Sequence, residues 1–149
     1  MDHPTDRFAD DAVRHFDKGF NCAESSLLGL AEYLGIDSPV IPMIASGFGG
    51  GIARSQSLCG ALAGSIMGLG LKFGRRSPEE DRTVIYQRTE ELIAAFRERF
   101  HTVSCRELTG IDFKNTEEFQ NRYPRVHAEV CSPVVRFAVE RTIAIFNRS

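Results

Sequence analysis

Apolar residues recur at spacings of three and four along most of this 149-residue chain, and no segment alternates apolar with polar residues as a β-strand would. Helix caps, prolines at first positions and terminal glycines divide the pattern into separate helices. The spacing predicts helices over residues 5–18, 22–34, 40–46, 58–74, 77–100, 105–108, 115–121 and 133–146. We therefore expect an all-α fold, a compact multi-helix bundle in which residues 1–149 form a single domain.

Glycine marks two features of this bundle. The stretch from Gly47 to Gly51 is predicted to be a Gly-rich loop. In the apolar segment that follows, Gly60, Gly64 and Gly68 are four residues apart, which aligns them on one stripe of a helix and lets another helix approach closely. The apolar run is also shorter than the roughly 20 residues of a membrane span. This segment is therefore predicted to be a buried, Gly-rich central helix.

The net charge of the chain and its N-terminal residues limit which binding partners and which cellular compartment we expect. The net charge is −2 and the isoelectric point is about 6.1, so nothing favours binding to nucleic acid or to an anionic membrane. The polar, acidic start of the chain lacks the basic and apolar regions of a signal peptide. We expect a cytoplasmic protein whose thiols are kept reduced.

The cysteines follow a shared local pattern. Asn21-Cys22-Ala23-Glu24 and Ser104-Cys105-Arg106-Glu107 both read as a helix cap, a cysteine at the first helical position and a capping glutamate. Cys59 and Cys131 also fall at or beside predicted helix starts. The positive end of the helix dipole favours thiolate over thiol, and thiolate is the form that reacts or binds metal. The alternative is that all four cysteines are buried packing residues.

Other residues are weaker candidates for a site. The loop residues Gly49, Gly50 and Gly51 could cradle a bound group with backbone N–H groups, with Arg54 adding positive charge beside Cys59. The interpretation that we favour is a loop that needs positive φ or tight packing. His127 precedes Cys131 by four residues, so on a continuous helix it would share a face with that cysteine and could be a further ligand.

Four stretches together resemble the C_GCAxxG_C_C family of redox-active proteins, which is named for its cysteine pattern. They are "GFNCAESSL" at 19–27, "ASGFGGGIARSQSLCGALAGSIMGLGLKFGR" at 45–75, "FRERFHTVSCRELTGID" at 96–112 and "CSPVVRFAVE" at 131–140. One departure is that Gly64 lies one residue further from Cys59 than the family name implies. The resemblance implies a helical fold and a redox role. The cysteine region is also similar to the cluster-carrying part of split-Soret cytochromes.

Three functions are therefore weighed. In the first, Cys22, Cys59, Cys105 and Cys131 converge on one site that binds an iron–sulfur cluster or another metal and transfers electrons. In the second, the same four residues are the redox-active thiols of a metal-free thiol–disulfide enzyme. In the third, they hold a structural zinc in a non-catalytic helical module. The expected partner is another redox protein, and a homodimer is also considered.

Overall fold

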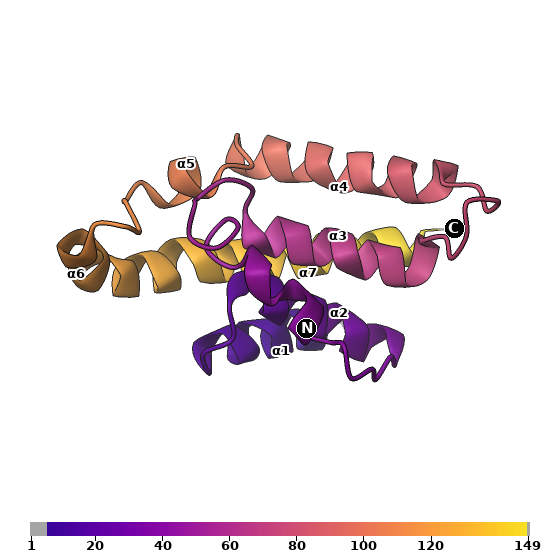
Figure 1. Cartoon of the computed structure of the whole chain (residues 1–149), viewed down its shortest axis with the longest axis horizontal. Helices are drawn as coiled ribbons and strands as arrows, with labels where there is room; N and C mark the ends of the chain where they lie inside the picture. Colours follow the sequence, from indigo (N-terminus) through magenta and orange to yellow (C-terminus); the bar gives the residue numbers. More distant parts are fainter. Residues whose placement is uncertain (1–5, 149) are drawn as a thin grey trace.

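A computed structural model describes residues 6–148 as a bundle of helices (Figure 1). The α-helices are α1 (Asp6–Asp17), α2 (Cys22–Leu34), α3 (Gly60–Phe73), α4 (Thr83–Phe100), α5 (Cys105–Thr109), α6 (Thr116–Val126) and α7 (Ser132–Asn147). A 3₁₀-helix, η1, spans Met43–Phe48, and a π-helical turn, η2, spans His127–Cys131. Within residues 6–148 there is no β-strand, only one isolated bridge between Leu58 and Ser104. The predicted all-α fold is confirmed.

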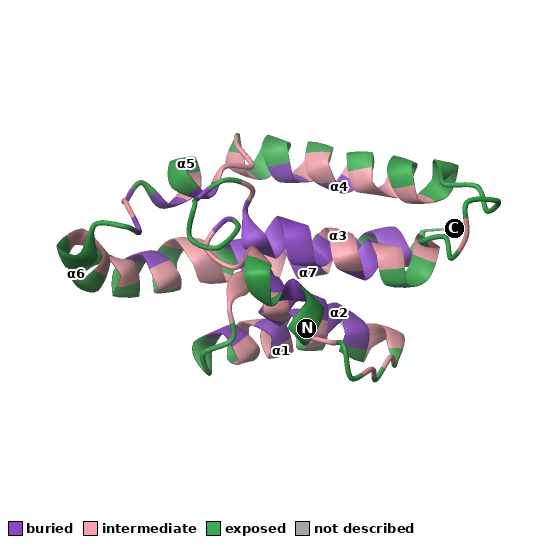
Figure 2. Cartoon of the chain, viewed as in Figure 1, coloured by how far each residue is buried: buried purple, intermediate pink, exposed green. Residues whose placement is uncertain are grey.

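Helix α3 lies at the centre of the bundle. It contacts α2 on one side, α4 on another and α7 along its length, while α1 packs against α2 and α7 (Figure 1). Figure 2 shows α3 largely buried and α4 with an exposed outer face. The inward face of α4 is the one that the spacing predicts, since Leu92 and Phe96 are fully buried. In the part of the chain that the structure describes, no helix is both long and apolar enough to span a membrane.

The glycine stripe of α3 faces α2, as predicted. A methyl group on Gly64 would collide with the backbone carbonyl of Ala23, and one on Gly68 would collide with the side chain of Leu30. At the start of the helix, a methyl group on Gly60 would collide with the sulfur of Cys22. The missing side chains therefore set the distance between α2 and α3, and they bring the first turns of the two helices together.

Alanine at Gly64 should destabilise the fold by about 1–3 kcal/mol or more, because the obstacle is backbone and cannot rotate away. Gly70 is a matched control on the same helix, since a methyl group there has nothing within 4 Å. Gly70→Ala should instead stabilise the helix by about 0.5–1 kcal/mol. Urea unfolding of both variants measures the difference, and a Gly64→Ala protein as stable as Gly70→Ala would show that the helices can separate without cost.

The predicted start of α4 is wrong. The helix expected to begin at Ser77 begins at Thr83, because the Asp81 carboxylate accepts hydrogen bonds from the Thr83 N–H at 2.8 Å and hydroxyl at 2.6 Å. The Glu80 carboxylate meanwhile accepts a hydrogen bond from the Arg76 N–H at 2.6 Å, which holds the preceding residues in a turn. Side chains such as those of asparagine, aspartate and serine can hydrogen-bond to nearby backbone groups, which gives the backbone an alternative to the helical conformation. Thr5, the predicted first residue of the first helix, lies outside the described residues.

The largest departure is at α6 and α7, which form one continuous helix through η2. The prediction placed a break between residues 121 and 133, on the ground that proline interrupts a helix. Helix α6 nevertheless continues through Pro124, and at η2 the Ser132 N–H donates to the His127 carbonyl, five residues back. This wider π turn accommodates the proline at position 133. The helix changes its hydrogen-bond spacing there and continues instead of ending.

Candidate functional site

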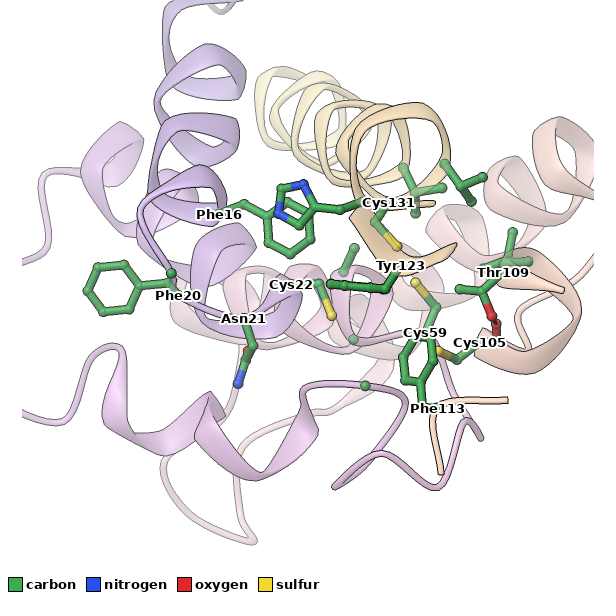
Figure 3. A pocket seen from close by; sticks show the side chains of 18 residues that line it. Phe16, Phe20, Asn21, Cys22, Cys59, Cys105, Thr109, Phe113, Tyr123 and Cys131 are labelled. Atoms are coloured by element: carbon green, nitrogen blue, oxygen red, sulfur yellow. Dashed lines mark hydrogen bonds between the residues drawn. The ribbon is translucent and has the colours of Figure 1, made fainter. Parts of the chain in front are cut away.

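All four cysteines line a single cavity of about 280 Å³ (Figure 3). They come from four separate parts of the chain: the start of α2, the residue before α3, the start of α5 and the η2 turn. Cys59 and Cys105 are buried, Cys22 and Cys131 are partly buried, and all four are free thiols. The convergence that the first hypothesis requires is therefore present. Phe20, one of the lining residues, is 40% exposed.

The caps that place Cys22 and Cys105 are formed as predicted. Asn21 accepts a hydrogen bond from the Glu24 N–H at 2.8 Å, and the Glu24 carboxylate accepts one from the Asn21 N–H at 2.8 Å, which completes a capping box. At α5 the Ser104 hydroxyl accepts from the Glu107 N–H at 3.2 Å. Each cysteine therefore occupies the first position of its helix.

Cys59 and Cys105 are held together by backbone hydrogen bonds. The Cys59 N–H donates to the Val103 carbonyl at 2.8 Å, and the Cys105 N–H donates to the Ser57 carbonyl at 2.7 Å. These bonds flank the bridge between Leu58 and Ser104. A short antiparallel pairing thus fixes two of the four cysteines before any side chain is considered, and sequence periodicity contains no signal for a bridge this short.

Cys131 does not lie at a helix start, contrary to the prediction. It is the last residue of η2, its backbone is α-helical, and no side chain caps the segment. Turns of this kind occur mostly as single insertions within α-helices and are frequent at functional sites. The helix-start pattern therefore explains the placement of three cysteines, and the π turn explains the fourth.

The loop between η1 and α3 winds in the left-handed sense. Gly50, Gly51, Ile52, Ala53 and Arg54 all have positive φ, from 50° to 72°. Left-handed backbone costs a residue with a side chain roughly 1–2 kcal/mol, and a β-branched residue such as isoleucine adopts it rarely. Such strain persists only where surrounding contacts impose it, and it concentrates at functional sites.

The glycines of this loop contact the cysteines or their supports. Gly50 lines the cavity, and its backbone forms a hydrogen bond with the Cys22 sulfur. A methyl group on Gly51 would lie 2.6 Å from Cβ of Cys105. One on Gly49 would lie 2.5 Å from the amide carbon of Asn21, the residue that caps α2. The loop therefore packs on both capped cysteines at once.

Arg54 and Gln56 anchor the loop to the segment between α5 and α6. Arg54 is exposed and is not among the residues that line the cavity: its guanidinium donates to the Phe113 carbonyl and lies over the Phe119 ring, 4.7 Å from the centroid. The buried Gln56 amide donates to the Ile111 carbonyl at 2.8 Å and accepts from the Phe113 N–H at 3.0 Å. Gln56 was missed by the sequence analysis, because a glutamine in a polar loop has no distinguishing pattern.

Aromatic rings close the other side of the cavity. His127 lies flat on Phe16, with ring centroids 3.8 Å apart, and its Nδ1 is 3.9 Å from the Asp17 carboxylate. Tyr123 is stacked on Phe119 at 4.5 Å. His127 does share the cavity with Cys131, as its spacing predicted. Its role as a ligand stays a prediction.

Burial, rather than the helix dipole, determines the direction in which the pKa values of the four thiols shift. Burial, together with a smaller contribution from the charge of Cys22, raises the pKa of Cys59 and of Cys105 to about 12. Burial also raises the pKa of Cys22, although the backbones of Gly50, Ala23 and Gly60 hydrogen-bond its sulfur and oppose the shift. Burial also raises the pKa of Cys131, with the charges of the other three cysteines adding to the shift. The prediction that helix starts would lower these values is wrong, because the cavity wall is apolar and excludes the water that a thiolate needs.

Metal-free, reduced protein should therefore alkylate slowly at pH 7–8. The fraction of Cys59 and Cys105 present as thiolate is small at that pH and rises only as the pH approaches 12, so labelling should accelerate steadily up to that range. Labelling with iodoacetamide, followed by peptide mass spectrometry at each pH, measures the four residues separately. Half-maximal labelling of Cys105 below pH 8.5 in folded protein would restore the helix-start interpretation.

The spacing of the four cysteines limits what they can bind. Across residues 6–148, no group of three or more His, Cys, Asp or Glu side chains is arranged to hold a single metal ion. Yet the charge of Cys22 raises the pKa of each of the other three cysteines, so the four sulfurs lie within electrostatic range. The arrangement is one of four thiols around a shared apolar space.

Fold and cavity together define a small helical protein that gathers four cysteines around one buried space. The chain belongs to the family described as "Putative redox-active protein (C_GCAxxG_C_C)", which matches residues 20–145. It is also 31% identical to a protein of Archaeoglobus fulgidus described as "Uncharacterized protein", with 83% of each chain covered. No solved structure matches the chain. The family resemblance that the cysteine motifs indicate is confirmed.

Proposed function

We propose that Cys22, Cys59, Cys105 and Cys131 bind one iron–sulfur cluster in the cavity and that the protein transfers electrons. The observation that supports the proposal is the convergence of all four cysteines on one buried apolar space of about 280 Å³. When bound, a cluster of this kind takes up and releases electrons singly. The electron partner would be another redox protein, and the reducing cytoplasm expected from the sequence suits free thiols.

The charge of the site favours a cationic occupant. Four neighbouring thiols in an apolar cavity resist deprotonation, because each thiolate would be poorly solvated and would repel the others. Bound metal reverses this preference, since a coordinating thiol loses its proton outright. The cavity is thus a poor place for bare thiolates and a suitable one for thiolates bonded to iron.

The chain's own backbone would support the bound sulfurs. Gly50, Ala23 and Gly60 form backbone hydrogen bonds with the Cys22 sulfur, and Ala61 and Leu62, in the first turn of α3, form them with the Cys59 sulfur. Hydrogen bonds to sulfur and exclusion of solvent are two of the means by which a protein sets a cluster's reduction potential. The apolar wall formed by Phe16, Leu108 and Val134 excludes water.

A cluster suits the spacing better than a single zinc ion. Tetrahedral zinc holds sulfur at about 2.3 Å, which requires the four sulfurs to be roughly 3.8 Å apart. No such group exists among the described residues. In a cluster each iron has its own cysteine ligands, so the sulfurs are spread more widely around a larger centre.

A metal-free thiol–disulfide enzyme is less favoured, because it needs an attacking thiolate near neutral pH. With the pKa values of Cys59 and Cys105 at about 12, the attacking form is scarce. The two proposals predict different colours. Anaerobically purified or reconstituted protein should be brown, with broad absorption that bleaches on reduction. A colourless protein that instead forms disulfides reversibly would favour the thiol–disulfide enzyme and overturn the cluster.

A further inference from the structure

One polar group on the cavity wall has no partner in the protein. Besides the cysteines, the lining residues with polar side-chain atoms are Asn21, Thr109, Tyr123 and His127. Asn21 uses both ends of its amide, donating to the Ser46 carbonyl at 3.0 Å and capping α2. Thr109 donates to the Cys105 carbonyl at 2.8 Å and accepts from Gln56 at 3.1 Å. The Tyr123 hydroxyl, by contrast, makes no hydrogen bond within residues 6–148.

The ring that carries this hydroxyl is held firmly. Tyr123 is stacked on Phe119, meets Phe113 edge-on at 5.5 Å and meets His127 edge-on at 5.8 Å. Figure 3 shows Tyr123 among the four cysteines.

Tyr123 is partly buried, and a tyrosine hydroxyl that lines a cavity usually finds a hydrogen-bond partner. The phenol is protonated at neutral pH even at its ordinary pKa of about 10, so it can act as a donor. The sulfur atoms of the four cysteines are among the acceptors that line the same cavity. A donor fixed beside negatively charged sulfur stabilises the more negative, reduced state of a cluster.

We infer that Tyr123 is a positioning residue of the four-cysteine site, whose hydroxyl donates a hydrogen bond to a sulfur of the bound cluster or its ligands and raises the reduction potential. The inference rests on the proposed function. The phenol keeps its proton, so an external reductant supplies one electron and no proton is transferred. The ring forms part of the wall of the cavity, and the hydroxyl provides a polar contact from a side chain.

The test compares Tyr123→Phe with Tyr86→Phe in anaerobic, cluster-loaded protein. Phenylalanine keeps all three ring contacts of Tyr123, and Tyr86 is a matched control because it is 56% exposed on α4. Redox titration followed by absorbance gives each potential, and iron content and thermal midpoint are measured on the same samples. Tyr123→Phe should be harder to reduce, by on the order of tenfold in the equilibrium constant, which is about 59 mV for one electron. Tyr86→Phe should match the wild type.

The possible outcomes distinguish a failure of the Tyr123 inference from a failure of the proposed function. Equal potentials in the three coloured proteins, at equal iron content, would overturn the role of Tyr123 and leave the cluster in place. A folded Tyr123→Phe protein that retains less iron than Tyr86→Phe would support contact between the hydroxyl and the site. A wild-type protein that takes up no iron would overturn the proposed function and this inference with it.

Discussion

Alanine at Gly51 should destabilise the protein by about 2–5 kcal/mol, the largest effect expected of any single methyl group in the chain. Two costs combine there. The φ of +69° costs a residue with a side chain about 1–2 kcal/mol. The new Cβ would also lie 2.6 Å from Cβ of Cys105 and 2.7 Å from Cα of Gln56, and overpacking of this kind costs about 1–3 kcal/mol.

Two other glycines separate these costs. Gly110 has nearly the same φ, +70°, but open space around it, so Gly110→Ala should lose only the conformational part, about 1–2 kcal/mol. Gly47 is exposed, has no positive φ and no neighbour within 4 Å, so Gly47→Ala should change stability by less than about 0.5 kcal/mol. Denaturant unfolding of the three variants gives the order. A Gly51→Ala protein as stable as Gly110→Ala would show that the loop does not press on Cys105.

Replacing Cys131 with serine should reduce iron affinity by at least 10–100-fold. That loss is usual when a residue that only supports a metal ligand is changed, and Cys131 is proposed to be a ligand itself. This cysteine is the most informative of the four, because it reaches the cavity from the η2 turn and not from a helix start. Ala128→Ser is a matched control in the same turn, since Ala128 is exposed and outside the cavity. Iron retention equal to that of the control would remove Cys131 from the site and leave three cysteines.

Local sequence signals predicted the parts of the site that local chemistry determines. The cap at Asn21, the cap at Ser104 and the left-handed Gly110 after α5 all depend on residues within four positions of one another. The stripe of Gly60, Gly64 and Gly68 also depends only on helical spacing, which is why close contact with another helix could be anticipated.

The features that were missed depend on distant contacts. The left-handed turn at Ile52 is unfavourable in isolation and is imposed by Gln56, which bonds to residues more than 50 positions further along the chain. The π turn at Cys131 arises inside a helix that prolines were expected to end. The direction of the cysteine pKa shifts follows from burial, which tertiary packing decides, so helix dipoles alone gave the wrong sign.

Analysis of iron and acid-labile sulfide in anaerobically purified protein tests the central claim most directly. If the four cysteines bind one cluster, wild-type protein should contain iron and labile sulfide in a fixed, nearly whole-number ratio to protein, and both should fall together in Cys59→Ser. Reconstitution with iron and sulfide should restore them in the wild type but not in the variant. Wild-type protein that retains no more iron and sulfide than Cys59→Ser after reconstitution would contradict the account.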